Sequence, residues 1–249
     1  MRDTSAIAIH WETYRGVVVL TGAGVSVASG LPTYRGKGGL WEKVESAKLA
    51  DAAAIFERPH EVWAFFSKAR LHVHKAAPNA GHQALASIER LVREAGHDFL
   101  LITQNVDGLH QRAGSGEVVE LHGSITKARC SDPGCDLPPF DLQGKHKGKR
   151  APPCPHCTAP LRPDVVLFGE MLPTDAIQRA KHALDTCDLF LAVGTSGTVY
   201  PAASFVRSAE YAGARTLYLN LEAMDPSDPA FDEVLLGPAE VLLPRLLGL

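Results

Sequence analysis

The sequence predicts an α/β fold: a doubly wound parallel sheet with helices on both faces, and a second, smaller domain. Short runs of apolar, often β-branched residues recur along the chain, as is typical of strands buried on both faces. Segments with apolar residues at helical spacing separate these runs. The alternation predicts a parallel sheet with right-handed crossovers, and two segments that interrupt it predict the smaller domain.

The strands and helices of the large domain are expected in a regular order. Strands are predicted at 17–20, 99–103, 189–193 and 216–219. A helix is predicted at 81–96, where Gly96 provides a stop signal, and another at 173–188, which begins with Pro173. Each helix leads into a strand, as in a βαβ unit.

Two segments interrupt this order. Residues 37–75 have a helical pattern with several aromatic residues, whereas residues 129–160 are rich in Cys, Pro, Gly and Lys. We expect them to form the small domain, as a helical module and a cysteine-rich module. The large domain is then expected from 1–36, 76–128 and 161–249.

The composition limits the classes of function. The chain has 249 residues, of which 45% are hydrophobic and 21% charged, and a net charge of -3 gives no indication of sequence-independent nucleic-acid binding. No uncharged apolar run approaches the roughly 20 residues that cross a bilayer, and the first residues lack the apolar region of a secretion signal. We therefore expect a cytoplasmic protein with no membrane and no specific nucleic-acid partner. The oligomeric state stays open, and a monomer is compatible with the sequence.

Four of the five cysteines form two pairs, Cys130 with Cys135 and Cys154 with Cys157. Paired cysteines in a chain without a secretion signal favour a metal site over disulfides. Two short knuckles joined by a loop bring four thiolates to one tetrahedral Zn²⁺, and because protein fills all four positions we expect the zinc to be structural. His156 is an alternative ligand, although an exposed knuckle side chain is the favoured interpretation.

Polar stretches follow the predicted strands. They lie at 22–26, 103–114, 194–201 and 220–222. Because the carboxyl ends of parallel strands meet at one edge of a sheet, these stretches should converge on one crevice.

The residue types in this crevice suit an adenine dinucleotide. Gly22 and Gly24 would let main-chain amides approach a pyrophosphate, and Asn220 and Glu222 would hydrogen-bond ribose hydroxyls. The usual dinucleotide fingerprint has a third glycine where this chain has Val27, and an acidic residue after the next strand, which is absent. An NAD-dependent dehydrogenase is therefore disfavoured.

One histidine is distinguished by its position. His122 lies in the stretch ELHGS, between the strand-end loops and the cysteine-rich module and near QNVD at 104–107. A lone histidine is more often structural, but imidazole titrates near neutral pH and suits general-base work. The location favours the catalytic interpretation.

Several stretches follow one another from about residue 17 to the end of the chain: GAGVSVASGLPTYR, TQNVDGLHQRAG, ELHGS, the two cysteine pairs, RPDVVLFGE, GTSGTVYPAA and NLE. In this order they resemble the sirtuin family of NAD-dependent protein deacylases. Thr33, where the family often has Asp, resembles the branch that includes bacterial and desuccinylating members. The resemblance implies that the large domain is a Rossmann-like NAD-binding domain, and that the small domain combines a helical module at 37–75 with a zinc-ribbon module at 129–160.

The resemblance also implies that NAD is a co-substrate, consumed as an acyl group leaves a protein lysine, with nicotinamide and O-acyl-ADP-ribose as products. His122 would be the base that activates a ribose hydroxyl, Asn105 would position ribose and water, and Asp107 would bind the nicotinamide carboxamide. The residues implied to contact NAD are Gly22, Ala23, Gly24, Ser26, Pro32, Tyr34, Arg35, Gln104, Asn105, Asp107, His122, Gly194, Thr195, Ser196, Asn220, Leu221, Glu222 and Ala239.

The expected partner is an acyl-lysine protein substrate. In the family, the main chain around Val165, Phe168 and Gly169 pairs with the substrate peptide as an added strand. The branch that removes acidic acyl groups has a tyrosine and an arginine where this chain has Phe66 and Ala69, and the neighbouring Arg70 is rotated by about 100° on a helix. Acetyl or longer apolar acyl groups are therefore favoured over succinyl or malonyl.

Three alternatives stay open. The same activated NAD could serve protein mono-ADP-ribosylation, the deacylase could prefer longer or acidic acyl chains, or the chain could be a non-catalytic NAD sensor. The intact QNVD and HG motifs favour deacylation.

Overall fold

The computed structural model describes residues 9–33, 44–142 and 148–248. The α-helices are α1 Val44–Leu49, α2 Ala54–Glu57, α3 Pro59–Lys75, α4 Ala80–Glu94, α5 Leu109–Arg112, α6 Thr174–Leu184, α7 Phe205–Tyr211 and α8 Ala239–Leu246. The short 3₁₀ helices are η1 Trp11–Thr13, η2 Ala23–Ser29 and η4 Ala202–Ser204.

The larger sheet has, in the described ranges, six parallel strands in the order β3-β2-β1-β7-β8-β9. They are β1 Gly16–Thr21, β2 Asp98–Thr103, β3 Val118–Glu120, β7 Leu189–Val193, β8 Arg215–Asn220 and β9 Glu233–Leu236. The order runs outward in both directions from β1 and β7, which is the doubly wound, Rossmann-like arrangement. The predicted fold class is confirmed, and the four predicted strands are β2, β1, β7 and β8 at the centre of the sheet.

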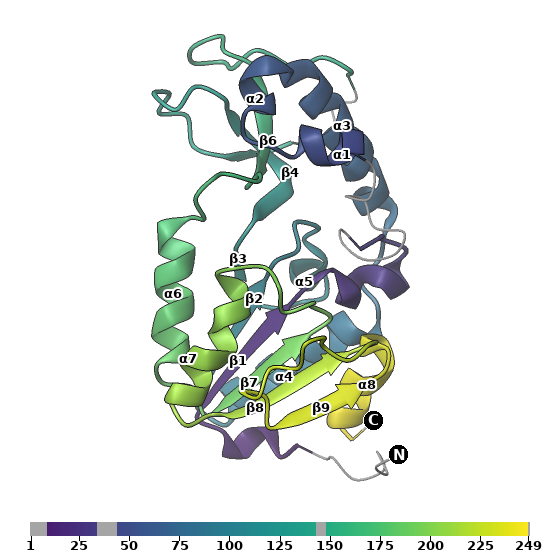
Figure 1. Cartoon of the computed structure of the whole chain (residues 1–249), viewed down its shortest axis with the longest axis vertical. Helices are drawn as coiled ribbons and strands as arrows, with labels where there is room; N and C mark the ends of the chain where they lie inside the picture. The colour runs from purple at the N-terminus through teal and green to yellow at the C-terminus, as the bar shows by residue number, and fades with distance from the viewer. Residues whose placement is uncertain (1–8, 34–43, 143–147, 249) are drawn as a thin grey trace.

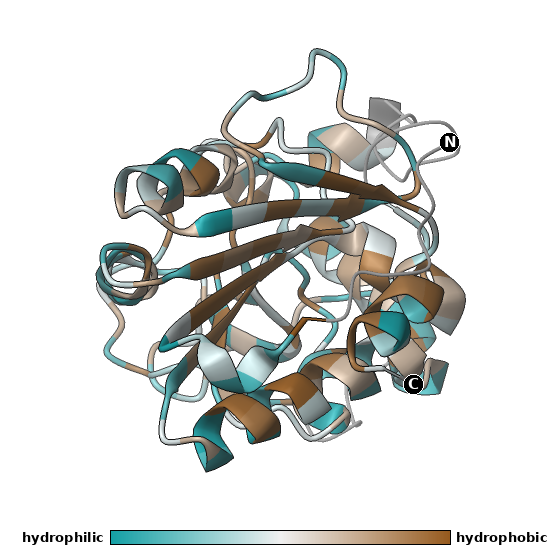
Figure 2. Ribbon diagram, turned by 90° about the horizontal axis from the view of Figure 1, so that it is seen from below, coloured by the Kyte–Doolittle hydropathy of each residue, from teal (hydrophilic) through white to brown (hydrophobic). Residues whose placement is uncertain are grey.

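Alternate residues of a central strand enter the two faces of the sheet. Val17 and Val19 of β1 belong to one apolar cluster, which includes residues of α4 and α8, whereas Val18 and Leu20 belong to a second cluster with residues of α6 and α7. Figure 2 shows these helices on both sides of the apolar strands. Burial on both faces explains why the central strands appear in the sequence as unbroken apolar runs.

A second sheet lies in the smaller part of the molecule, together with α1, α2 and α3 (Figure 1). It is antiparallel, in the order β5-β4-β6, with β4 Gly123–Cys130, β5 Phe140–Asp141 and β6 Leu161–Val165. Trp63 of α3 is fully buried against Cys130, Cys154 and Leu161 of this sheet and its loops. The division of the chain into domains stays a proposal, and the pairing of β4 with β6 favours boundaries near residues 122 and 166.

The loops that follow β1, β2, β7 and β8 leave the same edge of the large sheet, because the strands are parallel. Figure 1 shows that this edge faces the smaller part of the molecule. None of the helices in the described segments has the length and apolar character needed to cross a membrane.

Candidate active site

Two glycine loops meet where β1 and β7 end. The N–H of Gly22 donates to the carbonyl of Val193 at 3.0 Å, and the N–H of Gly24 donates to the carbonyl of Gly194 at 2.8 Å. A Cβ on either Gly22 or Gly24 would lie 2.7 Å from a main-chain atom of Gly194, which is too close for any other residue type. Both N–H groups are therefore used inside the protein, and the two glycines bring the two loops together. Their place in the NAD site stays a prediction.

Asn105 lies directly after β2 and is 3% exposed. Its main-chain N–H donates to Thr103 Oγ1 at 3.0 Å, and its Nδ2 donates to the carbonyl of Gly22 at 3.1 Å and to Ser26 Oγ at 3.3 Å. Its Oδ1 is buried without a hydrogen-bond partner in the described part of the chain. An unpartnered buried carbonyl oxygen is costly, so it marks a position where a ligand hydroxyl or a water molecule would bind.

Asp107 is placed beside Asn105 through Ser26. Its carboxylate accepts hydrogen bonds from Ser26 Oγ at 2.8 Å and from the main-chain N–H of Leu109 at 2.9 Å. Burial raises the pKa of Asp107, while these hydrogen bonds and the charge of Arg112 act in the opposite direction.

His122 lies between β3 and β4 and is half-buried. Its Nδ1 is 2.8 Å from the carbonyl oxygen of Gln104. A carbonyl only accepts hydrogen bonds, so Nδ1 carries the proton and Nε2 of the neutral ring has a free lone pair. Burial lowers the pKa of His122, and the hydrogen bond to Gln104 only partly opposes this shift. The ring is therefore neutral at physiological pH, with Nε2 as its basic nitrogen.

The predicted convergence of the strand-end loops is confirmed by hydrogen bonds between them. Gln104 Nε2, after β2, donates to Thr195 Oγ1 at 2.9 Å, after β7. Tyr218 Oη of β8 donates to the carbonyl of Thr195 at 2.9 Å, and Asn220 Nδ2 donates to Tyr218 Oη at 2.6 Å. Together with the contact of Asn105 to Gly22, these bonds join all four loops.

The other residues predicted to contact NAD lie around this centre, and their roles stay predictions. Tyr34 and Arg35 lie outside the described residues. Ala239 is buried at the start of α8, so its side chain belongs to the core of the large domain. The exposed residues of the set are Pro32, Ser196, Leu221 and Glu222, and Ala23 is half-buried.

Two buried histidines lie behind this centre, His82 of α4 and His110 of α5, and neither was predicted from the sequence as part of the site. Their ring centroids are 4.9 Å apart. Burial lowers the pKa of His82 to about 4 and, together with the proximity of His82, lowers the pKa of His110 to about 3. Both are therefore neutral. His82 ends the stretch PNAGH, and His110 lies within the stretch DGLHQRAG. Neither sequence pattern indicates that the ring is buried.

His82 connects the helix cap of α4 to Asp107. Its Nδ1 accepts the main-chain N–H of Asn79, the N-cap residue of α4, at 3.3 Å. The proton of the neutral ring is therefore on Nε2, which lies 3.4 Å from Ser26 Oγ, and Ser26 in turn donates to Asp107. Ser26 thus accepts from His82 and Asn105 and donates to the carboxylate.

The main chain predicted to pair with a substrate peptide is already partly paired. The N–H of Phe168 donates to the carbonyl of Ala50 at 2.8 Å, and its carbonyl accepts from the N–H of Ala52 at 2.9 Å. Val165 is part of β6, and its carbonyl accepts from Arg162. A peptide that paired with the main chain of Phe168 would have to replace these two bonds, so its pairing stays a prediction. Gly169, at φ 89°, is exposed and its main chain makes no hydrogen bond within the described residues, so it stays a candidate.

The predicted acyl-pocket residues lie on α3. Phe66 is buried in an apolar cluster and Ala69 packs against it, together with residues of β6 and of the loop after β2. Arg70 is held elsewhere: its Nε donates to the carbonyl of Ile125 at 2.7 Å, and its guanidinium lies 5.2 Å from the ring centroid of Trp63. Neither Phe66 nor Ala69 therefore provides a cation for an acidic acyl chain.

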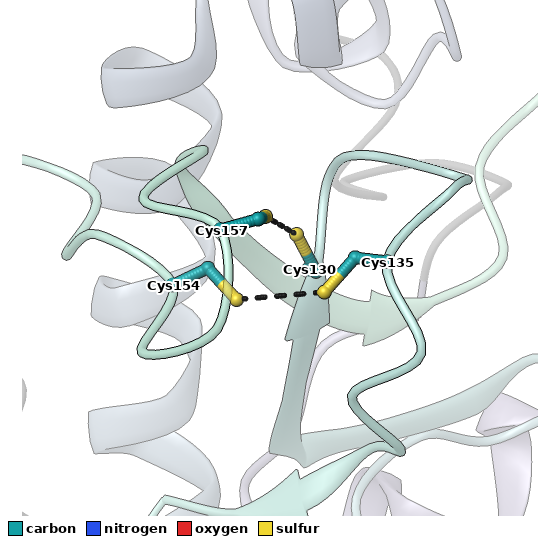
Figure 3. A group of neighbouring side chains, drawn as sticks. All are labelled: Cys130, Cys135, Cys154 and Cys157. Atoms are coloured by element: carbon teal, nitrogen blue, oxygen red, sulfur yellow. Dashed lines mark hydrogen bonds between the residues drawn. The ribbon is translucent and has the colours of Figure 1, made fainter.

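Four cysteines form the expected metal site (Figure 3). The sulfur atoms of Cys130, Cys135, Cys154 and Cys157 all lie within 4.8 Å of one another, and the Cys130–Cys157 and Cys135–Cys154 pairs are 3.4 and 3.8 Å apart. Tetrahedral zinc with Zn–S bonds of about 2.3 Å requires sulfur separations of about 3.8 Å, so the four thiols fit this ion. His156 Nδ1 instead lies 3.1 Å from Asp136 Oδ1 on the surface, which agrees with the prediction of an exposed side chain.

Comparison with known proteins identifies the family. The Sir2 family model matches residues 22–201. NAD-dependent protein deacylase 2 of Pyrobaculum aerophilum is 45% identical over 235 residues, which cover 94% of this chain and 90% of that protein. A Sir2 homologue solved as an NAD complex is 39% identical with a TM-score of 0.86, covering 96% of this chain and 90% of the other. A Sir2 protein solved with a deacetylated peptide and 3'-O-acetyl ADP ribose is 30% identical with a TM-score of 0.81, covering 96% and 94%. The chain belongs to the Sir2 family, so the resemblance found in the sequence is confirmed.

Proposed function

We propose that the protein is an NAD-dependent protein-lysine deacylase that favours acetyl-lysine and releases nicotinamide and O-acyl-ADP-ribose. One observation carries this proposal: the neutral His122 presents a free basic Nε2, and its Nδ1 is fixed by the residue that precedes Asn105. Family membership and the activities named for its relatives support it.

The residues of the crevice fit NAD as a co-substrate. The unpartnered Oδ1 of Asn105 would accept a hydrogen bond from a ribose hydroxyl or a water molecule. The carboxyl group of Asp107, buried beside it, would accept from the amide of nicotinamide. When bound, NAD supplies an electrophilic ribose carbon from which nicotinamide leaves.

His122 would act as the general base. Its Nε2 would take the proton of a ribose hydroxyl, and the carbonyl of Gln104 would stabilise the resulting imidazolium through Nδ1–H. Because the pKa of His122 is lowered by burial, the ring is in its basic form before it receives this proton.

The four cysteines would hold zinc as thiolates and would leave no coordination position open, so the metal would stabilise the small sheet and take no part in the chemistry.

The apolar surroundings of Phe66 and Ala69 favour acetyl or longer apolar acyl groups. The partner would be an acyl-lysine protein. Cysteines placed as metal ligands, with no disulfide among the described residues, support the expected cytoplasmic location.

The test uses the purified zinc-loaded protein, NAD and an acetyl-lysine peptide, with nicotinamide and deacetylated peptide measured in the same reaction. We expect the two products in equal amounts, and a loss of at least about 100-fold in His122→Ala with unchanged NAD binding and zinc content. His74→Ala, an exposed histidine on α3, is the matched control and should keep full activity.

Two outcomes would overturn the proposal. Normal turnover by His122→Ala would remove the assigned base. Nicotinamide release without deacetylated peptide, with ADP-ribose attached to protein instead, would favour the mono-ADP-ribosyltransferase alternative.

A further inference from the structure

A chain of hydrogen bonds leads from the buried His110 to the main chain of Asn105. His110 Nε2 lies 2.9 Å from Thr21 Oγ1 at the end of β1, and Thr21 Oγ1 donates to Thr103 Oγ1 at 2.9 Å at the end of β2. Thr103 Oγ1 also accepts the N–H of Asn105 at 3.0 Å. We call His110, Thr21 and Thr103 the threonine relay.

The direction of each bond in the threonine relay follows from the number of protons available. The single hydroxyl proton of Thr21 is donated to Thr103, so Thr21 can only accept from His110. His110 therefore carries its one proton on Nε2, and its Nδ1 is the nitrogen left without a hydrogen-bond partner in the described chain. A side chain that only accepts, or an apolar one, could not replace this donor.

Burial keeps the relay in this state. His110 is 1% exposed and Thr21 and Thr103 are 0% and 3% exposed, so water does not compete for these groups. The pKa of His110, lowered to about 3, keeps the ring neutral over the physiological range. A relay whose protons are fixed in this way holds the chain after β2 in one position.

The threonine relay holds Asn105 by its main chain, whereas other contacts hold its carboxamide. The carboxamide Nδ2 is held by Gly22 and Ser26, and its Oδ1 is free for a ligand. The main-chain N–H is held by Thr103, the last member of the relay. The direction of Oδ1 therefore depends on both attachments.

We propose that His110 is a positioning residue for deacylation, which fixes the main chain of Asn105 through Thr21 and Thr103 and so directs the free carboxamide oxygen at the reacting ribose or water. The inference rests on the proposed function for its effect on turnover. Its structural part, the fixed amide of Asn105, is measurable without turnover.

The experiment compares His110→Leu, which removes the donor, with His110→Gln, whose amide Nε2 donates from nearly the same position. We expect His110→Leu to lower kcat for acetyl-lysine peptide about tenfold, with KM for NAD and peptide within about twofold of the wild type, because only alignment is lost. His110→Gln should recover most of kcat. Hydrogen exchange at the Asn105 amide should be about tenfold faster in His110→Leu and near normal in His110→Gln.

A second pair of variants keeps the test informative if His110→Leu does not fold. Thr103→Val keeps the shape of the side chain without the hydroxyl, whereas Thr103→Ser keeps the hydroxyl. Thr103→Val should lower kcat about as much as His110→Leu, Thr103→Ser should be near normal, and the double variant His110→Leu/Thr103→Val should be no slower than Thr103→Val alone.

The proposal would be overturned if His110→Leu or Thr103→Val turned over normally with normal exchange at Asn105. Equal impairment of His110→Gln and His110→Leu would also overturn it, because that result indicates proton transfer or general packing. A wild-type protein without deacylation would defeat the proposed function instead, and the exchange rates would still decide whether His110 fixes Asn105.

Discussion

Gly24 and Gly194 join the two halves of the large sheet: the N–H of Gly24 donates to the carbonyl of Gly194 at 2.8 Å, and their α-carbons leave no room for a side chain between the loops. Gly194 is at φ 60°, in the left-handed region that favours glycine. This contact explains why the stretch after β1 is rich in glycine although it lacks the third glycine of the usual dinucleotide fingerprint. The glycines serve the packing of one loop against the other.

The first prediction concerns Gly24→Ala. The new Cβ would lie 2.7 Å from the Gly194 α-carbon, so the loops must separate, and we expect a loss of about 1–3 kcal/mol in the free energy of unfolding. Because the loops after β1 and β7 both border the proposed NAD site, NAD affinity should also fall, by about tenfold. Urea unfolding and calorimetric NAD titration measure the two effects.

Gly148→Ala is the control for this variant. Among the described residues, the atom nearest to a Cβ there would be the carbonyl oxygen of Arg150 at 3.6 Å, which is an ordinary contact. Its stability and NAD affinity should match the wild type. If Gly24→Ala behaved like Gly148→Ala, the close approach of the two loops would not be needed for binding.

The second prediction concerns the metal. The purified protein should contain one zinc per chain, and Cys154→Ser should lose it. Cys154 and Cys130 belong to the apolar cluster around Trp63, so loss of the metal should release the packing of α3 on the small sheet and cost more than about 3 kcal/mol in stability. Metal analysis and thermal unfolding check this.

Cys187→Ser is the matched control for the metal. The buried Cys187 thiol donates to the carbonyl of Leu184 at 3.4 Å and lies outside the metal group, so a serine hydroxyl can replace it. This variant should keep its zinc and most of its stability. Full zinc content in Cys154→Ser would contradict the assignment of the ligands.

The central strands could be predicted from the sequence, and the outer ones could not, for a physical reason. β1, β2, β7 and β8 are buried on both faces, so their sequences are unbroken apolar runs. β3 has only three residues, and β9 is an edge strand in which Val234 and Leu236 are about half exposed, so neither has a clear pattern. β6 contains Pro163, which argues against a strand until its pairing with β4 across the cysteine loop is known.

The residues of the candidate site likewise divide into those that could be predicted from the sequence and those that could not. The spacing of the four cysteines and the position of His122 indicate their chemistry, whereas Asn105 and Asp107 are predicted from the resemblance to the sirtuin family. His82 and His110 were missed because their role depends on burial and on partners distant in sequence, such as Thr21, which lies 89 residues before His110. The hydrogen bonds of Phe168 to Ala50 and Ala52 could not be predicted from the sequence either, since they join two segments more than a hundred residues apart.

The third prediction is a loss of stability in acid. His82 and His110 have pKa values lowered to about 4 and about 3 by burial, whereas in the unfolded chain they titrate near 6.5. Below pH 6.5 the unfolded state therefore binds more protons than the folded state, and stability falls as pH decreases toward these lower values. At pH 5 the loss should be about 2 kcal/mol for each histidine.

Burial raises the pKa of Asp107, Glu120 and Asp164, so these carboxyl groups favour the folded state as pH falls. The contribution of His110 to acid instability is therefore measured by comparing variants. Between pH 7.5 and pH 5, the wild type should lose about 2 kcal/mol more in urea unfolding than His110→Gln, which has no titrating ring at this position. Equal losses in both proteins would show that His110 is accessible to protons in the folded state.

The last prediction concerns the acyl group. Phe66 and Ala69 present apolar surface on α3, and Arg70 is held by the carbonyl of Ile125 and the ring of Trp63, so a carboxylate at the end of an acyl chain would be buried without a cation from these positions. Burying an unpaired charge is strongly unfavourable. Turnover of acetyl-lysine peptide should therefore exceed that of the succinyl-lysine version of the same peptide by at least about tenfold.

The double variant Phe66→Tyr/Ala69→Arg should narrow or reverse this ratio of acetyl to succinyl turnover, because it adds a hydroxyl and a guanidinium for the carboxylate. The control Ala69→Leu adds bulk without charge and should leave succinyl turnover low. A wild-type preference for succinyl-lysine would mean that a cation from another part of the chain reaches the acyl pocket.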